Sequence, residues 1–265
     1  MNKNSKTICF ARGKAEGQLY NGIVRDNAFF VVDGNPLKGK LTSMRLSFPL
    51  DRMSLLPPLD FKQIWCIGKN YVGHIKELKT TKDTNIPKEP IVFLKSANTL
   101  VGSGGFIRIP RWAGAIHYEG ELALVIGKEG KNIKEANALD YVLGYTILND
   151  VTARDLQAKD GQWTRCKNFD TFAPVGPGIL LTKELPSNTK LETRVNGKTM
   201  QSVTLDQMIF SIPRLIAHIS HFTTLHAGDI ISTGTPEGIG PIRPGDMVEV
   251  EISGIGILKN PCTGD

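Results

Sequence analysis

Two carboxylates lie within an apolar segment of the sequence, residues 117–125, which reads HYEGELALV. The segment is apolar on both faces, which predicts a strand covered on both sides. Side chains two apart on a strand share a face, so Glu119 and Glu121 would point the same way. Buried ionised carboxylates repel each other and lose hydration, and a divalent cation removes both problems. Asp150, at the end of a later predicted strand, would supply a third oxygen ligand.

Such a set of hard oxygen ligands favours Mg²⁺, with Mn²⁺ or Ca²⁺ as alternatives, over zinc. Three carboxylates also leave coordination positions open for water or a substrate. The alternative interpretation is that these acids are strand-end residues paired with lysine or arginine, or solvated. An E-x-E pattern on a strand is compatible with both.

Two further pairs have the spacing of neighbours on a helix. Arg154 and Gln157 are three residues apart and would share a face, where the guanidinium can bind a carboxylate through two hydrogen bonds. His74 and Glu77 have the same spacing, and a carboxylate beside an imidazole raises its basicity and fixes its orientation. The alternative for each pair is an ordinary exposed surface. Lys167 lies in an aromatic, proline-containing stretch, and its alternative is a surface loop lysine.

The elements that would position these residues are mostly strands. The pattern predicts an α+β, strand-dominated fold with a mixed sheet and few helices, because the strands do not alternate regularly with helices. Residues 204–225 have the clearest helical spacing, with Pro213 expected to kink or split the helix and Ser211 able to cap its second part. Pro57 and Pro58 mark the expected boundary between a small N-terminal β-rich domain, residues 1–57, and a catalytic domain, residues 58–265.

The composition excludes several classes of protein. The 265 residues are 40% hydrophobic and 22% charged, as in a soluble globular protein. No apolar run is long enough to cross a membrane and no secretory signal is apparent, so we expect a cytoplasmic protein. The four cysteines form no CxxC pair, which gives zinc or redox chemistry little support. The net charge of +6 is spread along the chain, which argues against nucleic-acid binding and favours attraction of small anionic substrates.

Six motifs occur in an order that resembles the fumarylacetoacetate hydrolase superfamily. They are IGKNYVGHIKE, PIVFLK, IHYEGELALVIGK, GYTILNDVTARDLQ, WTRCKNFDTFAPVGP and STGTPEGIGPIRPGD, and the resemblance runs from about Gln63 to about Cys262. It differs at Asn70, where the eponymous hydrolase has a fourth metal carboxylate nearby. In this respect the chain is similar to the shorter bacterial and mitochondrial members, which include acylpyruvate hydrolases, oxaloacetate decarboxylases and 2-hydroxyhepta-2,4-diene-1,7-dioate isomerases.

The resemblance implies a role for each candidate residue. It implies a β-rich, usually dimeric protein with a Mg²⁺ or Mn²⁺ site at Glu119, Glu121 and Asp150. His74 and Glu77 match a water-activating pair on a short lid helix. Four residues match positions that contact the substrate or the developing negative charge: Arg154, Gln157, Lys167 and Thr235.

The expected function is therefore metal-dependent chemistry on a small anionic 2-oxo acid. The first expectation is C–C hydrolysis of an acylpyruvate or decarboxylation, through an enolate held by the metal. In the hydrolysis, His74 oriented by Glu77 would activate water and Lys167 would help to stabilise the oxyanion. Isomerisation of a 2-hydroxy-diene-dioate from aromatic catabolism is the alternative, and a non-enzymatic anion or nucleic-acid binder is a third. Substrate specificity is expected to depend on residues 79–89 and the N-terminal segment.

Overall fold

The computed structural model describes residues 9–78 and 85–265. Of residues 79–89, which were expected to affect substrate specificity, residues 79–84 lie outside the described part of the chain. The fold is strand-dominated, with mixed sheets and few helices, which confirms the predicted fold class. Within the described residues, no helix combines the length and the hydropathy that crossing a bilayer requires.

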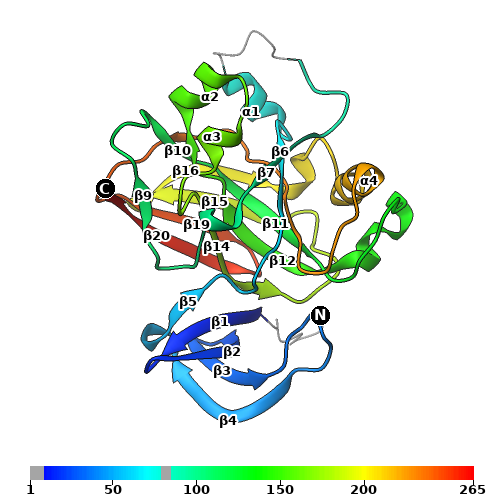
Figure 1. Ribbon diagram of the computed structural model, residues 1–265, viewed down its shortest axis with the longest axis vertical. Coiled ribbons are helices and arrows are strands. Elements are labelled where there is room, and N and C mark those ends of the chain that lie inside the picture. The colour runs from blue at the N-terminus through cyan, green and yellow to red at the C-terminus, as the bar shows by residue number, and fades with distance from the viewer. Residues whose placement is uncertain (1–8, 79–84) are drawn as a thin grey trace.

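The largest sheet has twelve strands and runs through the whole molecule (Figure 1). Ten of them follow the order β4-β3-β2-β1-β14-β12-β11-β17-β6-β7, while β5 pairs with β1 and β8 with β14. The pairings β17–β6 and β14–β8 are parallel. The strands are β1 (Cys9–Ala15), β2 (Gln18–Arg25), β3 (Ala28–Asp33), β4 (Thr42–Pro49), β5 (Ser54–Leu56), β6 (Ile64–Gly68), β7 (Ile91–Lys95), β8 (Leu100–Val101), β11 (Gly120–Ile126), β12 (Val142–Asn149), β14 (Ala173–Leu180) and β17 (Ile230–Ser232).

Two smaller sheets complete the β-structure. One has the order β13-β10-β18 and the other β16-β15-β19-β20-β9. Their strands are β9 (Ile107–Ile109), β10 (Ile116–Tyr118), β13 (Thr152–Ala153), β15 (Lys190–Val195), β16 (Lys198–Thr204), β18 (Gly240–Pro241), β19 (Met247–Ile252) and β20 (Gly256–Gly264).

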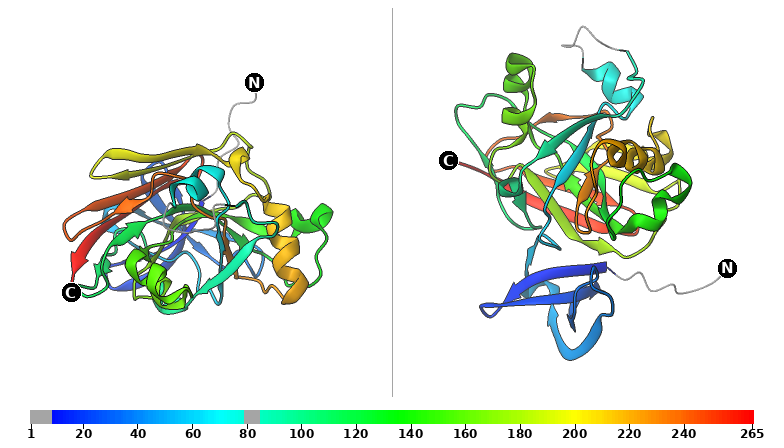
Figure 2. Two further views of the ribbon diagram at one scale, coloured as in Figure 1. Left: turned by 90° about the horizontal axis from the view of Figure 1, so that it is seen from above. Right: turned by 45° about the vertical axis from the view of Figure 1, so that its right-hand side comes forward.

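The helices are short and cluster in two places. α1 (Val72–Glu77), α2 (Arg154–Asp160) and α3 (Thr164–Lys167) gather at the end of the molecule away from β1–β4, whereas α4 (Ile212–Phe222) lies to one side (Figures 1 and 2). Within residues 9–78 and 85–265, four 3₁₀ helices link other elements: Leu50–Arg52, Ala97–Thr99, Glu135–Tyr141 and Leu205–Gln207.

The N-terminal strands β1–β4 form the blue end of the molecule in Figure 1. They are hydrogen-bonded to the rest of the large sheet through β1 and β14, where Cys9 lies opposite Leu180 and Phe10 opposite Ile179. The sheet thus continues across the predicted boundary at Pro57 and Pro58, and the division into two domains stays a prediction.

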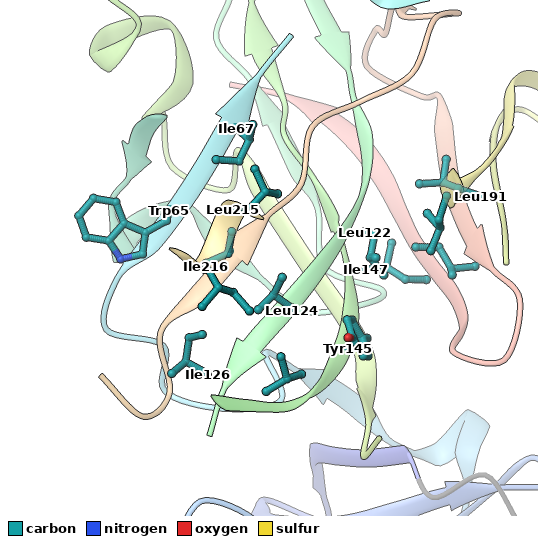
Figure 3. Close-up of a cluster of buried hydrophobic side chains, with 14 of the residues drawn as sticks. Trp65, Ile67, Leu122, Leu124, Ile126, Tyr145, Ile147, Leu191, Leu215 and Ile216 are labelled. Carbon is teal, nitrogen blue, oxygen red and sulfur yellow. The ribbon is translucent and has the colours of Figure 1, made fainter. Parts of the chain in front are cut away.

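The core is built on both faces of β11, as its sequence predicts. Leu122, Leu124 and Ile126 belong to one core cluster with residues of β6 and α4, and Figure 3 shows Leu124 beside Ile216 and Leu122 beside Ile147. Ala123 and Val125 belong to a second cluster on the opposite face, together with Phe10 and Cys66. All five β11 side chains are completely buried. The pairing of β11 with β12 is regular from Gly120 to Val125 and shifts only at a bulge between Val125 and Ile126.

Two local predictions need correction. Residues 117–126 are not one strand: β10 belongs to the three-stranded sheet and β11 to the large sheet, with Glu119 at the break between them. Residues 204–225 are not one helix either, because α4 begins only at Ile212. Pro213 lacks an N–H and fits only the first turn of a helix, where Ser211 accepts a hydrogen bond from the N–H of Arg214 at 3.4 Å, as predicted.

Candidate metal centre and active site

Three acidic side chains converge where β10, β11 and β12 meet. Gly120 lies opposite Asn149 in the β11–β12 pairing, and the N–H of Asp150 donates to the carbonyl oxygen of Glu119 at 2.8 Å. This register brings Glu119, Glu121 and Asp150 together, with one carboxylate oxygen of each within 4.8 Å of the others. All three are buried. The sequence-based grouping of these acids is therefore matched by their positions.

Lysine and arginine side chains neutralise two of the three acids. The Nζ of Lys167 lies 2.8 Å from Oε2 of Glu119 and 2.6 Å from Oδ2 of Asp150. Arg154 forms an ion pair with the other oxygen of Glu119. The Nζ of Lys95 lies 2.7 Å from Oδ1 of Asp150, and both side chains are fully buried. The alternative reading of the acids as ion-paired residues thus applies to Glu119 and Asp150.

Glu121 differs, because within the described chain its polar partners are neutral. The hydroxyl of Ser232 and the N–H of Gly234 both donate to Oε2, at 2.5 and 2.9 Å. Burial and the nearby charge of Asp150 raise the pKa of Glu121 well above its usual value. For Glu119 the charges of Lys167 and Arg154 outweigh the effect of burial and hold the pKa below its usual range.

The raised pKa of Glu121 makes the stability of the metal-free protein depend on pH. A carboxyl group whose pKa is higher in the folded state destabilises the fold progressively as pH rises above its unfolded value of about 4.3. Glutamine keeps an oxygen for Ser232 and Gly234 but carries no charge. The stability advantage of Glu121→Gln over the wild type, measured by urea unfolding in EDTA, should therefore grow from pH 5 to pH 8. A difference that stays constant across this range would contradict the pKa shift.

Lys95 is a site residue that the sequence analysis did not single out. It also donates to the carbonyl oxygen of Val151 at 3.2 Å, so it fixes both Asp150 and the chain that follows it. The one sequence feature that could have indicated Lys95 is its place at the end of the apolar run PIVFLK, most of which forms the edge strand β7. Only the long-range pairing of β6 with β7 and β17 directs this lysine toward Asp150.

Removing Lys95 should destabilise the protein strongly. Breaking a buried ion pair from one side costs about 3–5 kcal/mol, and without Lys95 the Oδ1 atom of Asp150 loses its ionic partner while Oδ2 keeps Lys167. Lys95→Met is therefore expected to lower the free energy of unfolding by that amount in denaturant titrations. Lys183→Met is the matched control, because Lys183 and Asp140 form an exposed pair at 2.9 Å, worth less than about 1 kcal/mol. Equal losses in the two variants would contradict the buried pairing.

His74 and Glu77 lie on α1, and His74 lines the cavity that contains the three acids. Nδ1 of His74 is 3.5 Å from Oε2 of Glu77, too long for a strong hydrogen bond, and it is buried with no other hydrogen-bond partner among the described residues. Glu77 accepts the N–H of Gly238 on both oxygens, at 3.0 and 3.1 Å. Burial would raise the pKa of Glu77, but the neighbouring His74 and Gly238 outweigh it and lower the pKa.

Asn70, just before α1, has a structural task. Its side chain donates to the carbonyl oxygens of Phe210 and Thr233 and accepts the N–H of Phe210 at 2.7 Å. Asn70 therefore ties the start of α1 to the loop before α4 and to the end of β17. An uncharged amide can both donate and accept these hydrogen bonds. Asn70 is the position near which the sequence analysis expected the eponymous hydrolase to have a fourth metal carboxylate.

The remaining predicted substrate residues line the same cavity. Arg154 and Gln157 share a face of α2, as their spacing predicts, and Nη1 of Arg154 donates to Oε1 of Gln157 at 2.6 Å. The hydroxyl of Thr235 donates to the carbonyl oxygen of Gly120 at 3.0 Å and accepts from Gln201 at 2.9 Å, so it also supports the β10–β11 corner. The cavity has a volume of about 350 Å³ and is also lined by His74, Lys167 and the three acids.

This combination of motifs and geometry has counterparts in known proteins. A family profile described as the fumarylacetoacetate (FAA) hydrolase C-terminal domain matches residues 63–263. The chain belongs to the fumarylacetoacetate hydrolase family. The fold and the six ordered motifs therefore have a common explanation, and the resemblance found in the sequence is confirmed.

Relatives within the fumarylacetoacetate hydrolase family carry several activities. Oxaloacetate tautomerase YisK of Bacillus subtilis is 43% identical over 260 residues, which cover 93% of this chain and 83% of that protein. A solved structure of 2-hydroxyhepta-2,4-diene-1,7-dioate isomerase from Mycobacterium marinum is 38% identical, with a TM-score of 0.87 over 98% of this chain and 99% of that one. Maleylpyruvate hydrolase from Sphingobium sp. SYK-6, solved with manganese(II) and pyruvate, is 26% identical, with a TM-score of 0.80 over 97% and 99%.

The donor set of this family member fits a hard divalent cation. Its three carboxylates have oxygens close enough to share an ion, and the two neutral donors to Glu121 bind the same oxygen. When all three acids are ionised around a bound cation, their charges balance those of Lys95, Arg154 and Lys167. A bound dication would therefore make the cavity positive, which suits an anionic ligand.

Proposed function

We propose that the protein is a divalent-cation-dependent enzyme that acts on a small 2-oxo acid through its enolate or enol. The observation that carries the proposal is the buried carboxylate triad, which opens onto a cavity lined by Arg154, Gln157 and Lys167. Acid residues to hold a cation and basic residues to hold an anion meet there in one place. Mg²⁺ or Mn²⁺ is the proposed ion.

The chemistry divides between the ion and the chain. A divalent cation held by Glu119, Glu121 and Asp150 would polarise the 2-keto group and stabilise negative charge on its oxygen. Arg154, fixed by its bonds to Glu119 and Gln157, offers guanidinium N–H groups to a substrate carboxylate. The ammonium group of Lys167 adds positive charge where the substrate oxygen becomes negative, and it needs no rearrangement to do so.

His74 is the proposed proton-transfer group. Its side chain is buried and lines the cavity, and its Nδ1 lies 3.5 Å from Oε2 of Glu77. In a tautomerisation, the imidazole would take the proton from C3, and that proton would pass to the 2-keto oxygen as it becomes the enol hydroxyl; the reverse reaction would return it to C3. The reaction moves protons only and consumes no co-reactant.

Proton transfer of this kind is the reaction we place first. The relatives named tautomerase and isomerase are 43% and 38% identical, and the maleylpyruvate hydrolase is 26% identical, while a solved fumarylacetoacetate hydrolase is 33% identical. Hydrolysis also needs a water held by an oriented base, and Glu77 is bound to Gly238 instead of closely to His74. C–C hydrolysis of an acylpyruvate, or decarboxylation, is the second candidate, because it requires the same stabilised enolate.

A panel of three substrates separates these reactions. Oxaloacetate, acetylpyruvate and a 2-hydroxy-diene-dioate would each be incubated with Mn²⁺ or with EDTA, and enol absorbance, pyruvate release and CO₂ release would be followed. Mn²⁺-dependent interconversion of enol and keto forms without cleavage is the expected result. Faster release of pyruvate from acetylpyruvate would favour the hydrolase. Equal reaction rates with Mn²⁺ and with EDTA for all three substrates would contradict the proposed function.

A further inference from the structure

The cavity of the candidate site shares a wall with a second, larger groove. The groove has a volume of about 860 Å³ and runs along the edge strand β7 toward Phe222 at the end of α4. Phe93, Gly161 and Trp163 line both spaces. The side chains of Phe93 and Trp163 therefore separate the site, at about 350 Å³, from the groove outside.

The wall depends on a contact between two aromatic rings and on the absence of a side chain at Gly68. The rings of Phe93 and Trp163 are 5.1 Å apart and nearly perpendicular, at 81°. The indole of Trp163 lies over Gly68, where an added Cβ would come within 2.5 Å of its ring. Glycine at position 68 is thus what allows Trp163 to take its place in the wall.

The wall is also joined to the reacting end of the site. Trp163 immediately precedes α3, and its carbonyl oxygen accepts the N–H of Lys167 at 3.1 Å. The Nζ of Lys167 lies 5.0 Å from the centre of the Phe93 ring while it contacts Glu119 and Asp150. A substrate held at the triad therefore has this wall as a close neighbour.

The groove beyond the wall offers apolar surface. Leu94 and Phe222 are 47% and 53% exposed, and Ile91, Val92 and Trp65 also line it. An alkyl chain that passed the wall would bury this surface, which favours binding. While Phe93 and Trp163 remain in contact, a ligand bound in the site cavity cannot bury this apolar surface.

We propose that the Phe93–Trp163 pair sets the upper limit on the length of the chain that a 2-oxo acid carries beyond its reacting carbons. The inference rests on the proposed function and deepens it: the wild type selects short acids, and opening the wall admits long ones. A hydrophobic pocket discriminates about 10-fold or more per methylene that it cannot accommodate. Trp163→Ala should therefore improve the binding of 2-oxooctanoate relative to 2-oxobutanoate by at least about 10-fold.

The test measures binding and so does not depend on which reaction is catalysed. Dissociation constants of 2-oxobutanoate, 2-oxohexanoate and 2-oxooctanoate would be determined by calorimetry for the Mn²⁺-loaded protein. Gly68→Ala is a second route to the same change, because the added Cβ displaces the indole without removing it. Trp112→Ala is the matched control, since Trp112 is 66% exposed, packs against Phe169 and lines neither space.

Three outcomes distinguish the possibilities. Weak binding of the long acid by the wild type and by Trp112→Ala, with improvement in Trp163→Ala or Gly68→Ala, supports the wall. The same chain-length profile in all folded variants overturns it while leaving the proposed function intact. Failure of the wild type to bind any of the acids in the presence of Mn²⁺ overturns the proposed function and this inference with it.

Discussion

Replacing Glu121 with glutamine is expected to abolish the response of the protein to divalent cations and to lower turnover by about 10³-fold or more. Within the described residues Glu121 has no lysine or arginine partner, so it is the triad member whose charge most depends on a metal ion. A bound ion contributes several kcal/mol to the stabilisation of developing charge, and about 4 kcal/mol corresponds to 10³ in rate.

Thermal unfolding with and without Mn²⁺ measures the metal response directly. The wild type should be stabilised by about 2.7 kcal/mol when Mn²⁺ is present at 100 times its dissociation constant, and Glu121→Gln should gain almost nothing. Glu135→Gln is the control, because Glu135 is an exposed acid paired with Arg214 at 3.0 Å. A Glu121→Gln protein that still shows the full shift would remove this carboxylate from the metal site.

The second large effect is expected for His74→Ala, which should lower kcat by about 10²–10⁴-fold while the Mn²⁺-dependent thermal shift survives. His74 lines the cavity but contributes nothing to the carboxylate triad, so proton transfer and metal binding should separate in this variant. Steady-state kinetics on the substrate that the panel identifies, together with the thermal shift, would show the separation.

The control for His74 is His218→Ala. His218 lies on α4 beside Phe222, at 6.1 Å between ring centres, and does not line the site cavity. Its replacement should leave kcat within about two-fold. If His74→Ala turned over substrate as fast as His218→Ala, another group would have to move the proton.

Much of the site could be predicted because its signals are local. The spacing of Glu119 and Glu121 predicted that the two acids lie together, and the three-residue spacing placed Arg154 beside Gln157. The pair on α2 depends only on the geometry of one helix, and the two acids are close in the sequence, so they stay together although the strand breaks at Glu119. The predicted triad also needed Asp150 at the end of a strand, where the antiparallel register with β11 brings it within reach.

The parts that could not be predicted depend on distant segments. Lys95 reaches Asp150 only because β7 pairs with β6, which in turn pairs with β17, and no local pattern records that order. Likewise Arg154 was expected to bind substrate, and nothing in its own helix indicates that its guanidinium also neutralises Glu119. The break at Glu119 was missed because the sequence stays apolar on both sides of it while the chain passes from one sheet to another.

The regular pairing of β11 also determines where the family can accept insertions. Side chains on a strand alternate between its two faces. One additional residue between Glu121 and Val125 would therefore turn the following side chains to the opposite face, and the acids would no longer be aligned with the core beneath them. Beyond the bulge at Val125 and Ile126 the chain enters a stretch without strands, residues 127–141, apart from an isolated bridge at Gly130. Length variation among homologues should therefore accumulate after the bulge, and the Glu121–Val125 segment should keep a fixed length in every member that retains the acids.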